Sequence, residues 1–467
     1  MMEFDNLNSE LLSNVDSALK YAHRTNSEVA YEIYLYYAHK SSMEINQGVV
    51  ESSDGVVAGN AVRVVGGSNE KKISFSSSSG VDLERIQANI KEALAFNNAL
   101  KITDSRFHSF PDPIPGGVEG ILSNEIIIAS VVDLLPMSQK VVSEAKEVDE
   151  RIKMTGFSIE ILWGGFAIGN SSGVQRASRI TSSGASFYCQ AIEGDDRKDA
   201  YEYSISRERI PEIQGLGETA ARKAVKLLNG KILNETTTLP TIWDNIASAC
   251  FIRAGIGAGS NGSNIVEGLS PLSDRIGDQV ATTDFTLLDD GQNPTGAYTH
   301  AIDAEGVPQQ KTTVVEKGIL KSFLFNHYYA RIFGTNSTGN CTRGGGIFPS
   351  SLPYEEPPAV VATNFVIEPQ KLSEEELISQ IDRGIYIKEM PLGIFHSNVS
   401  TGEFSAVANA AFLIENGELT TPLKAVSVAG SFYTGLKSLL QIGGNPKVTP
   451  IGVKTPSLVI DGLSLVF

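Results

Sequence analysis

Residues 401–430 read TGEFSAVANAAFLIENGELTTPLKAVSVAG and contain the clearest structural pattern in the sequence. Residues 404–414 alternate small, apolar and polar side chains, as a half-buried strand does, and residues 419–428 resume an extended pattern. Between them, Asn416-Gly417 supplies two residues that tolerate positive φ, which a tight hairpin turn requires. The stretch therefore predicts a β hairpin within a strand-rich C-terminal region.

The first half of the chain predicts the same order of elements twice: a helix, a meander of strands and a second helix. The first copy has helical patterns near residues 7–19 and at 81–100, around strand-like runs at 30–37, 42–50, 56–65 and 72–77. The second has helical patterns near 141–148 and at 217–228, around strand-like runs at 154–162, 165–170, 174–183, 185–193 and 200–206. Pro136 should start or interrupt a helix in the second copy.

Two boundaries divide the chain into three expected units. Residues 111–120, PDPIPGGVEG, hold three prolines and three glycines, a composition typical of a linker. A second boundary falls in the polar stretch that precedes Pro240, and a helix is expected later at residues 373–383. A chain of 467 residues exceeds the size at which one core keeps growing. We expect units at 1–112, 118–230 and 236–467, of class α+β with largely antiparallel sheets.

Composition excludes several classes of protein. The formal net charge is -16, with 38 basic residues dispersed among 54 acidic ones, so direct nucleic-acid binding is not expected. The N-terminal MMEFDNLNSE is acidic and polar, and no run of 18 apolar residues exists, which predicts a cytoplasmic protein without a membrane segment. Cys189, Cys250 and Cys341 lie far apart and are expected to be buried, reduced thiols.

The amino-acid sequence of the hairpin region resembles that of a known protein family. TGEFS followed by the IENG turn resembles the C-terminal domain of the TldD/PmbA family, peptidase-related proteins once called modulators of DNA gyrase. The resemblance runs from about Trp243 to the C-terminus, and the first 230 residues match only by pattern and order. Four more segments follow in the family's order: 274–280 (DRIGDQV), 288–291 (LDDG), 303–306 (DAEG) and 315–321 (VEKGILK).

The resemblance also implies where catalytic chemistry would lie. Catalytic members of the family carry HExxxH on a helix, and its two histidines and a downstream cysteine hold a zinc ion that activates water. That motif would fall within residues 246–262, which read IASACFIRAGIGAGSNG, with neither His nor Glu. Residues 443–462 also lack the cysteine. The chain therefore resembles the PmbA/TldE-type branch, with no catalytic residue, metal ligand or cofactor of its own, and zinc is expected in a TldD-type partner.

Other chemistries have weaker sequence signals. His300, His327 and His396 lie in the C-terminal unit without a recognised metal spacing, although Glu305, Glu316 and Glu403 are near them in sequence. A different site assembled from distant residues therefore stays open.

Residues 257–262, GAGSNG, match GxGxxG but follow a helix-like segment instead of a strand, so a helix end and flexible loop are expected. Ser260 and Ser263 lack the GxSxG elbow of serine hydrolases.

A glycine-rich run at residues 339–346, GNCTRGGG, resembles a family segment that lies near the zinc site in catalytic members. Glycine there permits a close approach to a bound peptide, and a mobile surface loop is the alternative. The resemblance implies these peptide-proximal candidates: Gly339, Asn340, Arg343, Gly344, Thr401, Gly402, Glu403, Phe404 and Ser405.

These observations predict a non-catalytic, TldE/PmbA-like subunit of a TldD/TldE-type zinc metalloprotease complex that acts on unfolded or precursor peptides. Its partners would be a TldD-type catalytic subunit, in a heterodimer, and peptides bound by strand addition to a sheet edge. Two alternatives remain. One is a self-sufficient metallopeptidase or hydrolase with an unrecognised site, and the other is a peptide-binding homodimer.

Overall fold

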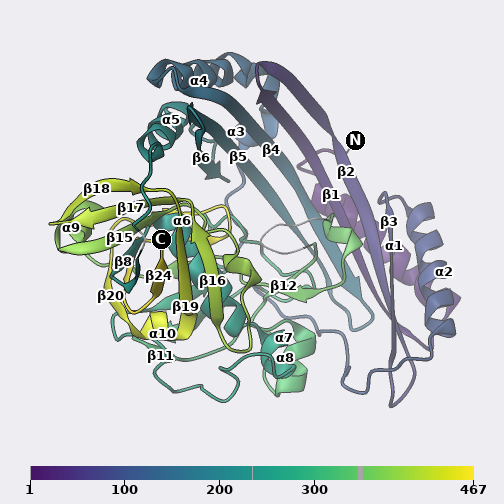
Figure 1. The fold of residues 1–467 in the computed structure, drawn as a ribbon. Helices are drawn as coiled ribbons and strands as arrows, with labels where there is room; N and C mark the ends of the chain where they lie inside the picture. The colour runs from purple at the N-terminus through teal and green to yellow at the C-terminus, as the bar shows by residue number, and fades with distance from the viewer. Residues whose placement is uncertain (1, 234, 345–350) are drawn as a thin grey trace.

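A single long sheet organises the first half of the molecule in the computed structural model, which describes residues 2–233, 235–344 and 351–467. Its strand order is β3-β2-β1-β4-β5-β6, and every neighbouring pair is antiparallel. The strands are β1 (Ala30–Asn46), β2 (Val49–Gly66), β3 (Lys72–Ser79), β4 (Ile152–Asn170), β5 (Gln175–Glu193) and β6 (Asp196–Ser206). Because β1 pairs with β4 along its length, the two expected N-terminal units share one sheet (Figure 1).

Several predicted strand ends are wrong, because glycines that look like breaks lie inside continuous strands. The runs at 154–162 and 165–170 are one strand, β4, and those at 174–183 and 185–193 are joined in β5. A Cβ on Gly164 would lie 2.4 Å from the carbonyl oxygen of Tyr37, and one on Gly165 2.4 Å from that of Ser178. These glycines permit close strand packing. The run at 42–50 instead spans the turn between β1 and β2.

Helices cover one face of this sheet and leave the other facing the C-terminal half (Figure 1). In β1, Ile33 and Leu35 pack beneath the helices, whereas Tyr34 contacts the C-terminal half, as the alternation of strand side chains requires. Pro136 lies in the first turn of α4, where a proline is tolerated. The covering segments are α1 (Leu7–Thr25), α2 (Leu83–Ala99), α3 (Asn124–Ile128), η1 (Val131–Leu134), α4 (Leu135–Val148) and α5 (Leu216–Leu227).

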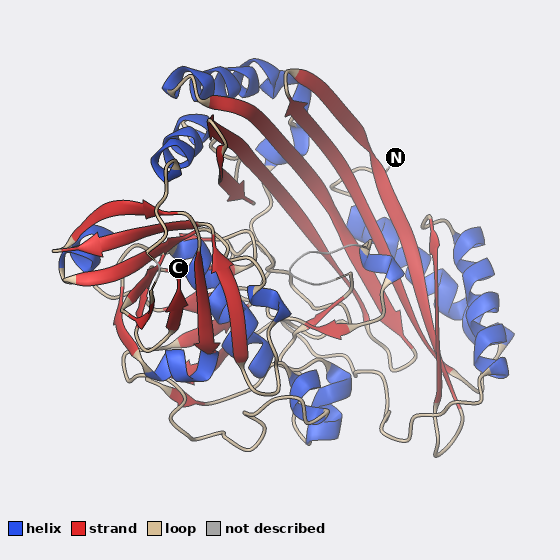
Figure 2. Ribbon diagram, viewed as in Figure 1, coloured by secondary structure: helices blue, strands red, loops and turns tan. Residues whose placement is uncertain are grey.

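The C-terminal half is rich in short strands (Figure 2). Three of its sheets have the orders β11-β10-β9-β14-β22-β21, β18-β17-β15-β8-β23-β20 and β16-β19-β24-β7, and β12 pairs with β13. Two pairs, β14–β22 and β8–β15, are parallel.

The strands of this half are β7 (Thr236–Thr238), β8 (Thr241–Trp243), β9 (Leu287–Asp290), β10 (Lys311–Glu316), β11 (Ile319–Leu320), β12 (Cys341–Thr342), β13 (Ala359–Val360), β14 (Phe365–Ile367), β15 (Arg383–Lys388), β16 (Glu403–Ala408), β17 (Ala410–Glu415), β18 (Glu418–Leu423), β19 (Val426–Ser431), β20 (Leu439–Ile442), β21 (Lys447–Val448), β22 (Val453–Thr455), β23 (Leu458–Ile460) and β24 (Ser464–Val466). Its helical segments are α6 (Asn245–Ile252), η2 (Arg253–Gly257), α7 (Gly262–Val266), α8 (His327–Phe333), η3 (Pro353–Glu355), α9 (Glu374–Ser379), η4 (Ile394–His396) and α10 (Phe432–Lys437). The predicted α+β class with mostly antiparallel sheets is confirmed.

The predicted hairpin forms, but its arms belong to two sheets. β17 and β18 pair across Asn416 and Gly417, whose φ angles of 50° and 79° are those of the expected turn. Further from the turn, β16 and β19 pair with each other in a separate sheet. Phe404 on β16 consequently lies in the core, stacked on Phe432 at a centroid separation of 4.5 Å.

Helix α6 is the centre of the C-terminal core. Residues 247–252 are all buried, and Phe251 packs edge to face against Trp243 and Phe432. The helix end expected within residues 257–262 falls near Gly259, because helical backbone continues through η2, a π-helical turn. A Cβ on Gly255 would lie 2.6 Å from Phe432 Cβ, so glycine here permits close packing.

Helix α9 is shorter than the helix expected at its position. The helix expected at 373–383 ends earlier, since α9 stops at Ser379 and β15 begins at Arg383, although Ser373 and Glu376 form the capping box of its start. Across the described part of the chain, every helix is too short or too polar to cross a bilayer.

Candidate functional site: a cavity between the long sheet and the C-terminal half

A cavity of about 440 Å³ lies where the open face of the long sheet meets the C-terminal half. Tyr34 and Tyr36 of β1 and Phe166 of β4 form one wall, and Tyr298 belongs to the opposite wall. Tyr34 and Phe166 stack at 5.5 Å, which gives that wall a flat aromatic surface. The volume is within the usual range of ligand pockets, about 300–1,000 Å³.

A wider groove of about 660 Å³ continues from this cavity along the sheet. The two share the lining residues Glu160, Ser182, Ala297 and Tyr298. The groove floor is rich in short hydroxyl side chains, among them Ser42, Ser158, Ser186 and Ser204. β6 is the edge strand of the sheet, and its last residues also line the groove.

A buried cluster of four charged residues holds the cavity's walls together, and we call it the arginine junction: Glu32, Arg63, Glu305 and Arg343. Arg63 donates to both carboxylate oxygens of Glu32, at 2.8 Å and 2.6 Å, and to Glu305 at 3.1 Å. Arg343 donates from Nη2 to Glu32 and lies over the Tyr34 ring, 4.7 Å from its centroid. Two guanidinium groups therefore balance two carboxylates between the sheet and the C-terminal half.

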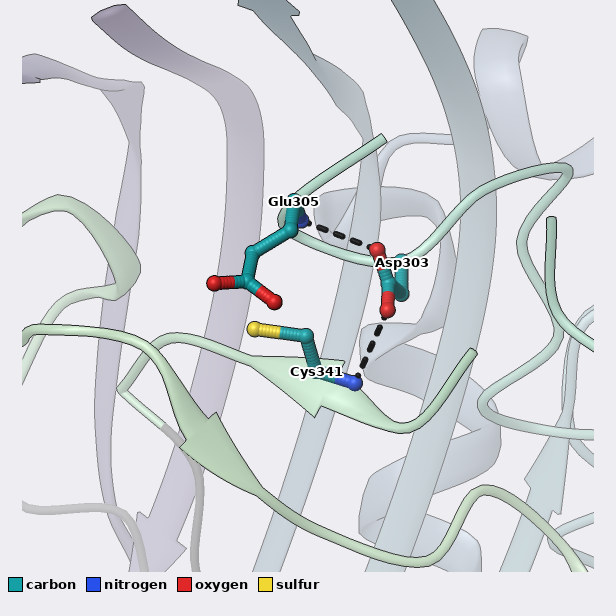
Figure 3. A group of neighbouring side chains, drawn as sticks. All are labelled: Asp303, Glu305 and Cys341. Atoms are coloured by element: carbon teal, nitrogen blue, oxygen red, sulfur yellow. Dashed lines mark hydrogen bonds between the residues drawn. The ribbon is translucent and has the colours of Figure 1, made fainter. Parts of the chain in front are cut away.

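Next to this junction, Asp303, Glu305 and Cys341 place three potential ligand atoms within 4.8 Å of one another. Figure 3 shows that both carboxylate oxygens of Asp303 are already engaged, since they accept hydrogen bonds from the backbone N–H groups of Glu305 and Cys341. Glu305 is occupied by Arg63 and by the His327 N–H. Burial raises the pKa of both the Asp303 carboxyl and the Cys341 thiol, and an ion at this position would have to replace the hydrogen bonds of Asp303 and the Arg63 contact of Glu305. These residues do not fit a zinc ion.

The three histidines of the C-terminal half do not gather into a metal site. Within the described ranges, the Asp303 group is the only set of three such ligands that meets the spacing, and it contains no histidine. His300 lines the cavity, and burial lowers the pKa of its imidazole to about 3, so it is neutral. His327 begins α8 and His396 ends η4.

The segment that would carry HExxxH instead presents an arginine to the cavity. α6 is buried as scaffold, and Arg253, the first residue of η2, lines the cavity. Its Nη1 donates to the Ala362 carbonyl at 3.5 Å, and its guanidinium lies 5.6 Å from the centroid of Phe365. The segment that follows α6 therefore places a cationic side chain at the cavity.

The structure separates the predicted peptide-proximal residues into two places. Arg343 and Gly344 line the cavity. Gly339 and Asn340 do not line the cavity and are packed into the protein: a Cβ on Gly339 would lie 2.3 Å from the Pro308 carbonyl oxygen, and buried Asn340 donates to Asp289 at 2.6 Å. Gly345 and Gly346 of the same run lie outside the described residues.

The TGEFS residues lie elsewhere. Thr401, Glu403 and Ser405 are exposed at the start of β16 and in the turn before it, and Phe404 is core. Gly402 has a φ of 72°, and a Cβ there would lie 2.3 Å from the Tyr433 ring. None of these five described residues lines the cavity.

Sequence reasoning missed Arg253 and most of the arginine junction. One signal was available, because Glu32 and Arg63 are single charges within the apolar runs AYEIYLYY and AVRVV. A lone charge at a buried strand position needs a partner. The partners Glu305 and Arg343 are 242 and 311 residues away from Arg63 and Glu32 respectively, and only the fold brings them together.

A second polar junction joins the far end of the sheet to the C-terminal half, and we call it the lysine junction: Glu202, Lys223, Asp244 and Glu389. Lys223 pairs with Glu202 at 2.6 Å. Glu389 has a φ of 63° and is fixed by two hydrogen bonds, from its N–H to Asp244 and from the Tyr201 N–H to its carboxylate. Burial raises the pKa of Glu389 to about 7.

Together, the fold and the cavity define a two-part α+β protein with a ligand-sized space enclosed between a long sheet and a strand-rich half. Residues 236–466 match the model described as the PmbA/TldA metallopeptidase C-terminal domain, and residues 128–228 match that of its central domain. The chain belongs to the PmbA/TldD metallopeptidase family.

Individual relatives agree with this assignment. The chain is 28% identical over 328 residues to "Metalloprotease PmbA homolog" of Haemophilus influenzae, covering 69% of this chain and 67% of that protein. It is 27% identical over 408 residues to "Metalloprotease MJ0996" of Methanocaldococcus jannaschii, covering 85% and 86%. The match to "Metalloprotease TldD homolog" of Buchnera aphidicola, 27% identical over 241 residues, covers 49% of this chain and 48% of that relative.

A solved structure shares the complete fold. TldE from Thermococcus kodakarensis superposes with a TM-score of 0.85, covering 97% of this chain and 100% of that one at 22% sequence identity. At that identity, the likeness concerns the fold.

Proposed function

We propose that this chain is a non-catalytic, TldE/PmbA-like subunit that pairs with a TldD-type zinc metallopeptidase and contributes part of the chamber that receives unfolded or precursor peptides. The observation that supports the proposal most strongly is the combination of burial and residue composition in helix α6. It is retained as the buried centre of the family's C-terminal fold, yet the segment that includes it contains neither His nor Glu. A partner subunit needs the fold in order to assemble, but it does not need metal ligands of its own.

The groove supports a role in holding extended peptides. Its polar floor lies beside β6, whose outer edge has no further strand in the sheet. A peptide added along such an edge is bound through main-chain hydrogen bonds, which do not depend on its sequence. Zinc would be supplied by the partner. The three buried, unpaired cysteines suit a cytoplasmic location, which cell fractionation tests.

Co-expression with a TldD-type chain that carries HExxxH tests the pairing. We expect a stable hetero-oligomer whose cleavage of an unfolded peptide is chelator-sensitive and is lost when the glutamate of the partner's motif is replaced by glutamine. The isolated chain should cleave nothing and retain no stoichiometric zinc on elemental analysis. A chain that forms only homo-oligomers and leaves the partner's activity unchanged contradicts the proposal.

The alternative of a self-sufficient metalloenzyme has one structural candidate in the described residues, the Asp303, Glu305 and Cys341 group. Stoichiometric zinc in the isolated chain, lost in Cys341→Ser together with chelator-sensitive cleavage, would establish that alternative. We expect Cys341→Ser to leave the metal content of the isolated chain unchanged at background.

A further inference from the structure

Arg253 lines the cavity and forms no ion pair with any of the described residues. Of the ion pairs formed by the described residues, none includes Arg253, and its single hydrogen bond is the long one to Ala362. Asp289 attracts it electrostatically but forms no ion pair with it, and Asp289 is held by Asn340. Arg253 is partly buried, and a partly desolvated guanidinium without a counter-ion is costly, so a ligand that supplies a negative charge would be stabilised here.

Further unmet donors lie around the same space. Arg343 is buried, and its Nε and Nη1 have no hydrogen-bond acceptor in the described part of the chain. The hydroxyl of Thr363, which also lines the cavity, is directed to the Asp289 carboxylate. Unsatisfied buried donors are uncommon in native structures and suggest groups that an absent ligand would satisfy.

The other ionisable groups of the cavity do not neutralise Arg253. Glu160 at the mouth pairs with Lys40 at 2.5 Å, and Asp303 accepts hydrogen bonds from three backbone N–H groups. His300 is neutral, so it adds no positive charge. Of the two guanidinium groups that line the cavity, Arg343 is paired with Glu32, and Arg253 has no carboxylate partner among the described residues. A carboxylate on an organic chain suits this site, because guanidinium and carboxylate match in geometry.

We propose that Arg253 binds the carboxylate of a peptide in this cavity, and that the carboxylate is the free C-terminus of a chain lying along the serine-lined groove. The groove opens into the cavity past Tyr298, so a chain in the groove can end beside Arg253. An aspartate or glutamate side chain would offer the same chemistry from within a peptide. This inference rests on the proposed function and names the peptide end that the subunit recognises.

Calorimetric titration of the full chain with three probes separates the sources of the carboxylate. The probes are acetyl-Ala-Ala-Val-Leu with a free C-terminus, its C-terminal amide, and the amide of acetyl-Ala-Glu-Val-Leu. We expect the free acid to bind at least tenfold more tightly than the first amide. Comparable binding by the glutamate amide would support the carboxylate site but assign it to side chains. Equal binding of the free acid and both amides would overturn the proposal.

Variants of Arg253 assign the effect to this residue. Arg253→Gln keeps a polar side chain but removes the charge, and should abolish the preference for the free acid, whereas Arg253→Lys should keep part of it. Arg275→Gln is the matched control, since Arg275 is a half-exposed arginine paired with Asp278 on the surface. Thermal unfolding checks that each variant is folded. An unchanged preference in folded Arg253→Gln contradicts the assignment.

The result of the peptide titration does not depend on the result of co-expression with a TldD-type chain. A chain that stimulates a TldD-type partner but binds acid and amide equally retains the proposed function and loses this inference. A chain that binds the free acid selectively but neither pairs with nor stimulates a TldD-type subunit retains this inference and loses the proposed function.

Discussion

The two junctions between the long sheet and the C-terminal half are built from the same kinds of charge but differ in how completely those charges are enclosed. In the arginine junction, the side chains of Glu32 and Arg343 are 0% and 1% exposed. In the lysine junction, Lys223 and Glu202 are 22% and 10% exposed. An enclosed pair is strong only while it is complete, whereas a partly solvated pair can replace a lost partner with water.

The difference also follows from the cations. Arg63 contacts Glu32 through two nitrogens and Glu305 through one, so a single planar group fixes two carboxylates. Lys223 is a point charge, and Glu202 has a second lysine, Lys447, at 3.6 Å. We therefore expect the arginine junction to set the stability of the domain contact and the lysine junction to tolerate change.

Removing Arg63 should have the largest effect. Arg63→Met removes the guanidinium that lies over the Phe110 ring and leaves Glu32 and Glu305 buried with less compensation, so we expect a loss of about 3–5 kcal/mol in unfolding free energy. Urea denaturation measures it. Arg275→Gln, which removes an exposed pair, should cost less than about 1 kcal/mol. Similar small losses in both variants would remove the distinction between enclosed and surface charges.

Glu389 should make the lysine junction sensitive to pH. Its pKa is about 7 in the folded chain against an ordinary 4.5, so between these values the folded state binds more protons than the unfolded state. Stability should therefore fall as pH rises from about 5 to 7. Glu389→Gln should flatten this fall by at most about 3 kcal/mol, measured as urea midpoints at each pH.

Charged groups near Glu389 determine how much of the pH dependence of stability comes from Glu389 itself. Lys223 opposes the raised pKa, and Asp244 and Glu202 favour it. Burial also raises the pKa of Asp244 and of Asp289, so some slope should remain in Glu389→Gln. A slope unchanged by this substitution would show that Glu389 is not the group that titrates.

Lys223→Met should have the smallest effect of the three. Glu202 keeps Lys447 and is partly solvated, so we expect a loss of about 1–2 kcal/mol. A double-mutant cycle with Glu202→Gln would isolate the pair itself. A loss as large as that of Arg63→Met would mean that the two junctions are equivalent.

Local sequence patterns predicted the hairpin turn at Asn416-Gly417, a helix start or break at Pro136 and a helix beginning near Ser373, because each depends on neighbouring residues. They misjudged Gly164 and Gly165 as strand ends. Those glycines are required by the backbone of adjacent strands, which is remote in sequence. The same reason explains why the arms of the hairpin could not be assigned to different sheets.

Sequence by itself predicted the family and the α+β class and showed that the chain contains no HExxxH motif, because these depend on residue identity, order and local periodicity. Tertiary structure decided that two N-terminal units form one sheet, that TGEFS lies away from the cavity, and that Arg253 faces the cavity without a counter-ion among the residues described. Those outcomes depend on which distant side chains share a low-dielectric space, and no local pattern records that.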